Sequence, residues 1–326
     1  MYARSLVSVS CFRLKSTLIC VLCVKVLHCQ LKLVFQHGPI YFVQGEEDCG
    51  WRKLSPPSER NANEKLSGTF LRKPRLPKKK FPHPPESVEP IPKSFDLRNK
   101  YPNCPSLFWV FEQSNCGGCY VTSASAMSDR ICIASKGAKK PKVSAESIIS
   151  CCDKCGRGCG GGYVDKVWLH LRGRVTSRVG CQPYSIAPCG REGEPKCSKD
   201  EADTPKCKAY CTNPKYGAPY RSEAYHGKSC HFLLREIMTY GSVVTGFTVY
   251  TDFHYYRRGV YEHTSGKSFG GHAVRVIGWG EEGGKPYWLA INSWGKNWGE
   301  NGTFRIRRGT NECGFEKFMV AGEPKM

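Results

Sequence analysis

The stretch Gln113-Ser114-Asn115-Cys116-Gly117-Gly118-Cys119-Tyr120 lies immediately before a helical pattern. From residue 119 to residue 136 apolar side chains recur close to a 3.6-residue period, which predicts an amphipathic helix that begins at Cys119. A thiol at a helix N-terminus feels the positive end of the helix dipole, and this favours the nucleophilic thiolate. Cys119 is therefore the candidate nucleophile. A C-x-x-C spacing also suits a disulfide or half of a zinc site, so it does not decide the matter alone.

Two further stretches carry polar side chains among small or aromatic residues. The first is Gly270-Gly271-His272-Ala273, at the start of a predicted strand, and the second is Asn292-Ser293-Trp294-Gly295. Taken singly, a histidine is usually structural, and a buried asparagine can simply hold a turn. Together with Cys119, however, they supply a nucleophile, a base and a group that orients the base.

The chain divides into a helix-rich part and a strand-rich part. Residues 143–151 predict a second helix with Ser144 as N-cap, and residues 163–172 predict a third. Between residues 240 and 326, short alternating apolar runs separated by glycines predict strands. We therefore expect an α+β fold with two lobes, helical mainly over residues 104–170 and β mainly over residues 220–326.

The first 90 residues differ in composition from the rest. Residues 16–24 are apolar and follow three basic residues, which predicts a signal peptide over residues 1–29; a buried strand or an incorrect start of the chain are the alternatives. The apolar run is too short to span a bilayer, so we expect no stable membrane span. Residues 55–92 are rich in proline and contain a run of three lysines at 78–80. Such sequence is extended, so residues 30–90 predict a plain linker or a removable propeptide.

Composition restricts the class of protein. Twenty cysteines in 326 residues indicate an oxidising compartment and several disulfides. The net charge of +21 is spread along the chain without an arginine-rich helical stripe, so nucleic acid is not an expected partner.

On the three motifs above, the chain resembles the papain family of cysteine proteases, and within it the cathepsin B branch. His272 lies farther downstream of Cys119 than the roughly 130–150 residues typical of papain, which suits the cathepsin B branch because it carries an insertion. Lys65 to Leu71 is similar to the end of a cathepsin B propeptide, and residues 91–96 are similar to its mature start. Other stretches that match this branch lie at residues 129–133, 151–152, 158–163, 179–185, 203–207 and 250–253.

The resemblance implies a papain-like two-lobe fold, with the active site in the cleft between a helical domain and a β-barrel-like domain. It implies a cysteine endopeptidase made as an inactive precursor, with residues 91–326 as the mature peptidase domain. Cys119 and His272 would form a thiolate–imidazolium pair, and Asn292 would orient the imidazole under the cover of Trp294. The side-chain amide of Gln113 and the backbone N–H of Cys119 would stabilise the oxyanion.

The resemblance also implies where the substrate binds. Gly161 and Gly162 resemble the backbone edge that pairs with an extended substrate, although a tight turn is an alternative reading, and Gly271 lies beside the catalytic histidine. Phe318 stands where cathepsin B has a glutamate that accepts arginine at P2, the second residue before the scissile bond. We therefore expect an apolar pocket for P2 and a preference for bulky hydrophobic or aromatic residues there.

Several departures from the family pattern affect activity. The segment at residues 189–197 corresponds to the occluding loop of cathepsin B but is shorter and lacks histidine, which predicts weak or no carboxydipeptidase activity unless Arg191 substitutes electrostatically. Ser114, Gly118 and Tyr120 replace the usual Gly, Ser and Trp, and Ser114 is expected to strain its turn. The rival interpretation is therefore a catalytically weak homologue that acts as a secreted binding or scaffold protein.

The remaining expectations concern cysteines and partners. The disulfides that the resemblance implies are Cys104–Cys132, Cys116–Cys159, Cys151–Cys207, Cys152–Cys155, Cys181–Cys211 and Cys189–Cys197. Cys230 and Cys313 are left unassigned, and a zinc site at Cys151, Cys152, Cys155 and Cys159 is the rival. No metal and no cofactor is expected. The implied partners are protein and peptide substrates, cystatin-type inhibitors and the chain's own propeptide, in a lysosomal or extracellular location.

Overall fold

The computed structural model of the chain forms two compact units, residues 1–60 and residues 61–326, and each is described by itself. The residues that the structure describes are 6–14, 17–26, 29–35, 41–44, 67–72, 90–171, 174–175, 178–189, 194–195, 197–198, 200–218, 224–230 and 234–325. Within them, no helix has both the length and the apolar character needed to cross a membrane.

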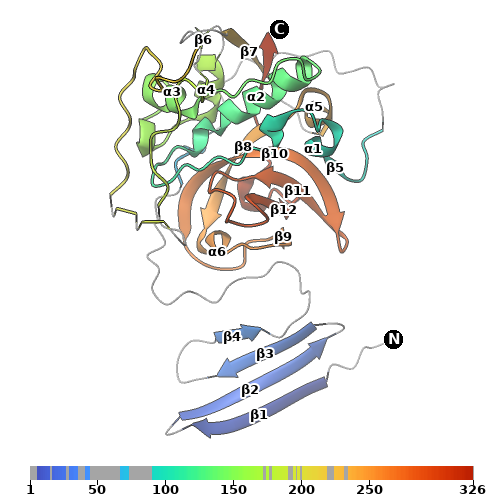
Figure 1. Ribbon diagram of the computed structural model, residues 1–326. Helices are drawn as coiled ribbons and strands as arrows, with labels where there is room; N and C mark the ends of the chain where they lie inside the picture. The colour runs from blue at the N-terminus through green and yellow to red at the C-terminus, as the bar shows by residue number, and fades with distance from the viewer. Residues whose placement is uncertain are drawn as a thin grey trace. The chain divides into compact units, whose positions relative to one another are not determined.

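The first unit contains a four-stranded antiparallel sheet in the order β1-β2-β3-β4 (Figure 1). Its strands are β1 (Leu6–Leu14), β2 (Thr17–Val26), β3 (Cys29–Phe35) and β4 (Tyr41–Gln44). The apolar run expected to belong to a signal peptide therefore lies largely in a strand. Whether residues 1–29 are removed from the protein stays a prediction.

The second unit begins with a helical lobe (Figure 1). Its helices are α1 (Leu97–Lys100), η1 (Pro105–Phe108), η2 (Cys119–Thr122), α2 (Ser123–Ala134), α3 (Ala145–Cys151), η3 (Gly158–Gly160) and α4 (Val164–Leu171), where η marks a 3-10 helix. The helix expected to begin at Cys119 starts with the 3-10 turn η2, and regular α-helix follows from Ser123. Ser144 caps α3 as predicted, since its side chain accepts a hydrogen bond from the amide of Ser147.

The strand lobe is built around one long strand, β10 (Ser268–Glu282). The sheet has the order β5-β10-β11-β12-β9, and β8 (Val243–Tyr250) pairs with β10 as well. This arrangement confirms the strands expected between residues 240 and 326. The other elements are β5 (Phe95–Asp96), β6 (Arg174–Val175), β7 (Ala224–Cys230), α5 (Leu234–Tyr240), α6 (Thr251–His254), β9 (Val260–Tyr261), β11 (Lys285–Ile291), β12 (Thr303–Arg307), η4 (Glu312–Gly314) and β13 (Ala321–Lys325).

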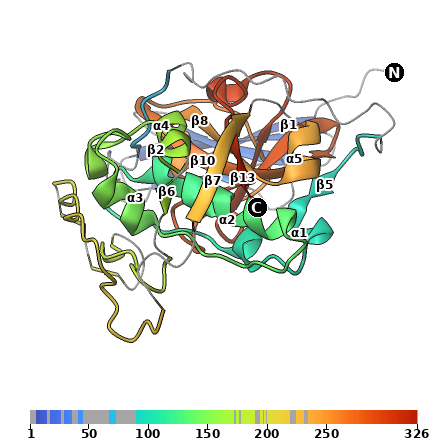
Figure 2. The ribbon, with the colours of Figure 1, turned by 90° about the horizontal axis from the view of Figure 1, so that it is seen from above.

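The two lobes exchange segments, so the division in space does not follow residue number alone. β5, from the start of the second unit, pairs with β10 in the strand lobe. β13, at the end of the chain, pairs with β7 and packs against α2 in the helical lobe (Figure 2). Each lobe is therefore completed by a segment that lies far from it in the sequence.

A buried ion pair joins the lobes close to the candidate catalytic residues. Arg275 on β10 donates to the Asp129 carboxylate of α2 at 2.7 Å, and both side chains are almost fully buried. The same guanidinium donates to the carbonyl oxygens of Ser106 and Trp109, while Ser242 donates to Asp129 at 2.6 Å. A buried charge is tolerated only when it is paired and hydrogen-bonded, so this network requires α2 and β10 to keep one relative position.

Replacing Arg275 by methionine should lower the free energy of unfolding by about 3–5 kcal/mol, because the Asp129 carboxylate would remain buried without its counter-ion. The measurement is urea unfolding of the disulfide-intact protein. Lys285→Met is the matched control, since that lysine is half exposed in its ion pair with Glu262 and should cost less than about 1 kcal/mol. Equal effects of the two substitutions would contradict this prediction.

Candidate active site

The Cys119 thiol lies in the first turn of the helix that runs into α2, and it is fully buried. A backbone hydrogen bond joins it to Ala273, the residue that follows His272 on β10. The thiol of one lobe therefore lies against the strand of the other lobe that carries the histidine. The pairing of Cys119 with His272 was predicted from two separate sequence motifs, and the structure brings these motifs together.

His272 is held by Asn292, as the resemblance implies. The distance between Nε2 of His272 and Oδ1 of Asn292 is 2.7 Å, and both residues are buried. The amide of Ser293 also donates to Oδ1 of Asn292, at 2.8 Å, which identifies this oxygen as the acceptor. Nε2 of His272 must then carry a proton, so any exchange of a proton with the Cys119 thiol falls to Nδ1.

Trp294 packs against the histidine. Its ring centroid lies 4.8 Å from that of His272, and the ring of His254 stacks on it at 5.0 Å with an interplanar angle of 3°. Burial in this aromatic layer lowers the pKa of His254 to about 4, so this second histidine is neutral near neutral pH. No role for His254 was predicted from the sequence, because its sequence neighbours do not connect it with the catalytic motifs.

Gln113 is oriented by Ser293, a residue for which no role was predicted from the sequence. The Ser293 hydroxyl donates to Oε1 of Gln113 at 2.6 Å, and Nε2 of Gln113 donates to the carbonyl oxygen of Cys116 at 2.8 Å. The amide of Gln113 also donates to the carbonyl oxygen of Ser293. These contacts fix the Gln113 amide group close to the chain leading to Cys119. The signal available in the sequence was the position of Ser293, directly after Asn292.

Ser114 was expected to strain its turn, because it stands where the family usually has glycine. Its backbone does adopt a strained conformation. Its φ is +55°, a left-handed value that costs a non-glycine residue roughly 1–3 kcal/mol. Two hydrogen bonds hold it there: its amide donates to Glu112 at 2.9 Å, and its hydroxyl donates to the carbonyl oxygen of Ala187 at 2.5 Å. Because glycine has no hydroxyl, serine both introduces the strain and supplies a contact that offsets it.

Residues 67–72, which lie far upstream of the helical lobe in sequence, pass directly over the thiol. The amide of Thr69 donates to the carbonyl oxygen of Gly271 at 2.9 Å. The amide of Phe70 donates to the carbonyl oxygen of Gly162 at 3.0 Å, and the Gly162 amide donates to the carbonyl oxygen of Gly68 at 2.7 Å. Gly162 and Gly271, two glycines predicted to bind substrate, therefore pair with an extended peptide from both sides.

The glycines at this point are required by close packing. A Cβ atom at Gly271 would clash with the Thr69 carbonyl oxygen, and one at Gly68 would clash with the carbonyl oxygen of Gly117. Gly161 has a φ of +97°, and a Cβ there would lie 2.7 Å from the carbonyl oxygen of Gly68. Gly161 and Gly162 were together expected to form either a pairing edge or a tight turn; Gly161 adopts the turn conformation, and Gly162 pairs with residues 67–72.

Residues 67–72, which we call the covering segment, change the chemistry of the thiol. Burial raises the pKa of the Cys119 thiol, although hydrogen bonds from the Thr69 side chain and from backbone groups of Ala273, Gly68 and Tyr120 act in the opposite direction. The Thr69 hydroxyl lies 3.2 Å from Sγ. The thiolate expected from the helix dipole alone is therefore disfavoured in this form of the chain, because desolvation outweighs the dipole.

Phe318 lies next to the covering segment. Together with Val164, Asp165, Gly246 and Val320 it lines a small cavity whose other walls are residues 69–72 of the covering segment. Leu71 packs against Gly246 and Gly271, where a Cβ atom would lie 2.8 and 2.7 Å from it respectively. An apolar side chain thus already occupies the position expected to bind the P2 residue.

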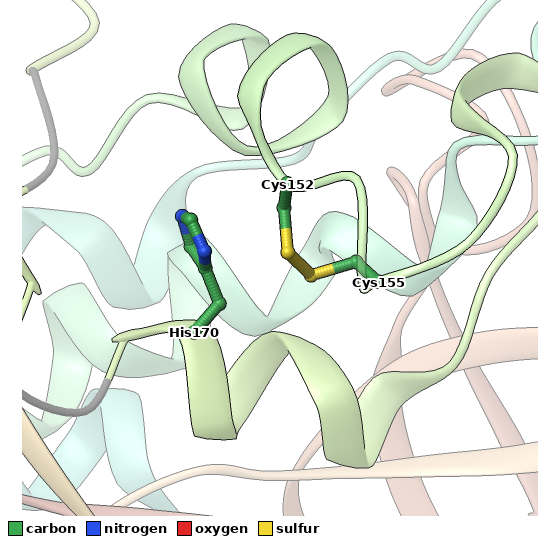
Figure 3. Close-up of side chains that lie close together, drawn as sticks. All are labelled: Cys152, Cys155 and His170. Atoms are coloured by element: carbon green, nitrogen blue, oxygen red, sulfur yellow. A yellow bond between two sulfur atoms is a disulfide. The ribbon is translucent and has the colours of Figure 1, made fainter.

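The structure contains the disulfides that the resemblance implies, namely Cys104–Cys132, Cys116–Cys159, Cys151–Cys207, Cys152–Cys155, Cys181–Cys211 and Cys189–Cys197. The four cysteines of the rival zinc site are all oxidised in these bonds. Figure 3 shows Cys152 and Cys155 beside His170, but sulfurs joined in a disulfide are not thiolate ligands. Cys119 and Cys313 are free thiols, and the side chain of Cys230 lies outside the described part.

In the full-length chain, Cys119 should react slowly with iodoacetamide near neutral pH and faster as the pH rises, because burial keeps its pKa above the ordinary value. Gly68→Ala should displace the covering segment and speed labelling near neutral pH by about tenfold for each unit by which the pKa falls. Labelled Cys119 would be quantified by peptide mass spectrometry. Gly217→Ala, at a glycine with no atom within 4 Å of its Cβ position, is the control; equal rates in both variants would refute the prediction.

Comparison with known proteins agrees with this geometry. The model of the papain family cysteine proteases matches residues 91–323. The chain is 44% identical to cathepsin B-like cysteine proteinase 4 of Caenorhabditis elegans, over 78% of this chain and 84% of that protein. It is 47% identical to cathepsin B-like cysteine proteinase 1 of Ostertagia ostertagi, over 73% and 74%. The solved structure of procathepsin B S9 from Trypanosoma congolense is similar with a TM-score of 0.75 and 34% identity, over 85% of this chain and 94% of that one. The chain belongs to the papain family of cysteine proteases, and its relatives are of the cathepsin B type.

Proposed function

We propose that this cathepsin B-like cysteine protease is an endopeptidase with Cys119 as nucleophile, His272 as general base and acid, and Asn292 as the group that orients the imidazole. The observation that carries the proposal is the contact between the two lobes. The Cys119 thiol lies against Ala273, and the adjacent His272 is hydrogen-bonded through Nε2 to Asn292. Nucleophile, base and orienting group thus follow one another in space as the chemistry requires.

The proposed reaction proceeds in two stages. Once the covering segment has left, Nδ1 of His272 takes the proton of Cys119, and the sulfur attacks the peptide carbonyl. The resulting oxyanion is stabilised by the amide of Gln113 and the backbone N–H of Cys119, and loss of one such donor typically costs about 3–4 kcal/mol in barrier. The imidazolium then protonates the leaving amine, and water hydrolyses the thioester with His272 as the base. Trp294 keeps water away from the bond between His272 and Asn292.

We propose that the chain is made as an inactive precursor. Residues 67–72 fall in the expected propeptide, residues 30–90, and they occupy the backbone edge that a substrate needs at Gly162 and Gly271. Cleavage near residue 90 would release residues 91–326 as the mature enzyme, and residues 1–29 would be removed as a signal peptide. Inhibition has two physical parts here: the segment blocks the pairing edge, and it raises the pKa of the nucleophile.

The proposed substrate preference follows from the cavity beside Phe318. Val164 and Val320 are apolar neighbours of this phenylalanine, and Leu71 of the covering segment fills the adjoining position. A bulky apolar P2 residue would replace Leu71 with similar contacts. Carboxydipeptidase action is expected to be weak or absent, because the Cys189–Cys197 segment contains no histidine to bind a C-terminal carboxylate.

We further propose a lysosomal or extracellular location, which the disulfides support, because such bonds persist in oxidising compartments. The proposed partners are protein and peptide substrates, the chain's own propeptide and cystatin-type inhibitors. A cystatin would compete with residues 67–72 for the same region, so its binding requires the segment to leave first.

A thiol-directed epoxide should label Cys119 in the protease-activated chain at mildly acidic pH and abolish peptide hydrolysis. Cys119→Ala should lose both labelling and activity, whereas Cys313→Ala, at the other free thiol in the described part of the chain, should retain both. Labelling is read by mass spectrometry and hydrolysis with a fluorogenic peptide. An activated chain that is neither labelled nor hydrolytic would instead support the rival function, a catalytically weak binding or scaffold protein.

A substrate series tests the pocket assignment. With P2 leucine the activated enzyme should have a higher kcat/KM than with P2 arginine, and Phe318→Glu should raise kcat/KM for P2 arginine by about tenfold or more by supplying a counter-ion. Phe318→Leu is the control and should leave P2 arginine poor. The same enzyme should release little dipeptide from a peptide with a free C-terminus. Efficient cleavage of P2 arginine by the unchanged enzyme would contradict the assignment.

A further inference from the structure

The covering segment carries one charged side chain, that of Arg72, and the partner of this side chain was not predicted from the sequence. Arg72 donates through Nη2 to both carboxylate oxygens of Asp165, at 3.1 and 2.9 Å. The Asp165 side chain is only 5% exposed, whereas that of Arg72 is 25% exposed. Asp165 lies in the first turn of α4 and lines the same small cavity as Phe318.

An aromatic ring completes the place where this guanidinium lies. The Arg72 guanidinium carbon lies 4.2 Å from the centroid of the Tyr163 ring, which is a close cation–π contact. Lys166 is the other cation near this ring, with Nζ at 4.6 Å from the centroid. One guanidinium nitrogen reaches both carboxylate oxygens, and the guanidinium carbon lies over the aromatic ring. Packing on an aromatic face is the feature that favours a guanidinium over an ammonium here.

The direction of the covering segment and the position of the Leu71 side chain indicate which substrate residue would lie beside Asp165 and Tyr163. The covering segment pairs with Gly162 and Gly271, and its residue numbers rise away from Cys119, so it runs opposite to the part of a substrate that precedes the scissile bond. An extended chain carries its side chains at the same spacing in either direction. Leu71 fills the apolar P2 position, and Arg72 is the next residue outward, which corresponds to P3, the third residue before the scissile bond.

We propose that Asp165 and Tyr163 form a subsite for the guanidinium of a P3 arginine, so that the preferred peptide has an arginine followed by an apolar residue before P1. This inference rests on the proposed protease function and adds a substrate class to it. Removal of residues 67–72 takes Arg72 away from the Asp165 carboxylate. A substrate arginine at the same position would regain the charge-assisted hydrogen bonds that Arg72 makes there, and so gain binding free energy.

The same contact also makes the covering segment a mimic of the substrate. Leu71 and Arg72 occupy the two neighbouring positions with an apolar and a cationic side chain, as the proposed substrate would. Inhibitory segment and substrate then depend on one carboxylate, and a change at Asp165 must weaken both. This double dependence distinguishes a recognition site from a carboxylate that only stabilises the fold.

The first experiment uses the full chain after proteolytic activation, with fluorogenic peptides that keep P2 leucine and P1 constant. Replacing P3 glutamine by P3 arginine should raise kcat/KM by about tenfold or more, mainly through KM, and P3 lysine should gain less. Asp165→Asn should abolish the gain, so that the P3 arginine and P3 glutamine peptides are cleaved with similar kcat/KM. Asp153→Asn, which removes an exposed carboxylate that lines the neighbouring larger cavity, is the matched control and should keep the gain.

Three results would overturn the inference. They are equal kcat/KM for P3 arginine and P3 glutamine, an equal loss on both peptides in Asp165→Asn, and an Asp165-dependent gain with arginine at P2 instead of P3. Failure of the protease function itself is a different result, in which no peptide of the series is cleaved.

A second measurement on the unprocessed chain needs no hydrolysis. Arg72→Gln and Asp165→Asn should each speed iodoacetamide labelling of Cys119 by about tenfold, because each loosens the covering segment. The double variant should label no faster than either single variant if the two side chains act as one pair. Effects that multiply in the double variant, or no effect of Arg72→Gln, would show that Asp165 does not hold a guanidinium there.

Discussion

The buried ion pair between Asp129 and Arg275 is the contact on which the rest of the arrangement depends. Asp129 lies on α2, the continuation of the turn that carries Cys119, and Arg275 lies on β10, three residues after His272. Neither charge can leave its partner without being stranded in a region of low dielectric constant. The two lobes can therefore differ in composition and packing and still present thiol and imidazole to each other in one geometry.

Above this junction, backbone groups rather than side chains define the binding surface. Gly162 and Gly271 offer carbonyl and amide groups from opposite lobes, and the absence of side chains allows an extended peptide to approach closely. Main-chain pairing of this kind provides affinity without sequence preference. In the proposed protease, selectivity would then come from the side chains at the edges of the surface, among them Phe318 and Asp165.

The covering segment shows how one sequence can hold a reactive group in an unreactive state. The dipole of the helix start favours the thiolate at Cys119, but full burial beneath Gly68 and Thr69 favours the neutral thiol and raises its pKa. In the proposed precursor, inhibition would require no change in the candidate catalytic residues, since His272 already keeps its hydrogen bond to Asn292. Activation would then consist of letting water and substrate reach a site that is already assembled.

The sequence by itself determined the local elements and pointed to the candidate catalytic groups. Periodicity placed α2, α3 and α4, the cap at Ser144 was readable, and the motifs around Cys119, His272 and Asn292 indicated the family, because these signals depend on neighbouring residues. Only the tertiary structure decided the raised pKa of Cys119, the pairing of Arg72 with Asp165 and the exchange of β5 and β13 between lobes. Desolvation and ion pairing depend on what lies nearby in space, and partners 93 residues apart leave no local pattern from which their contact could be read.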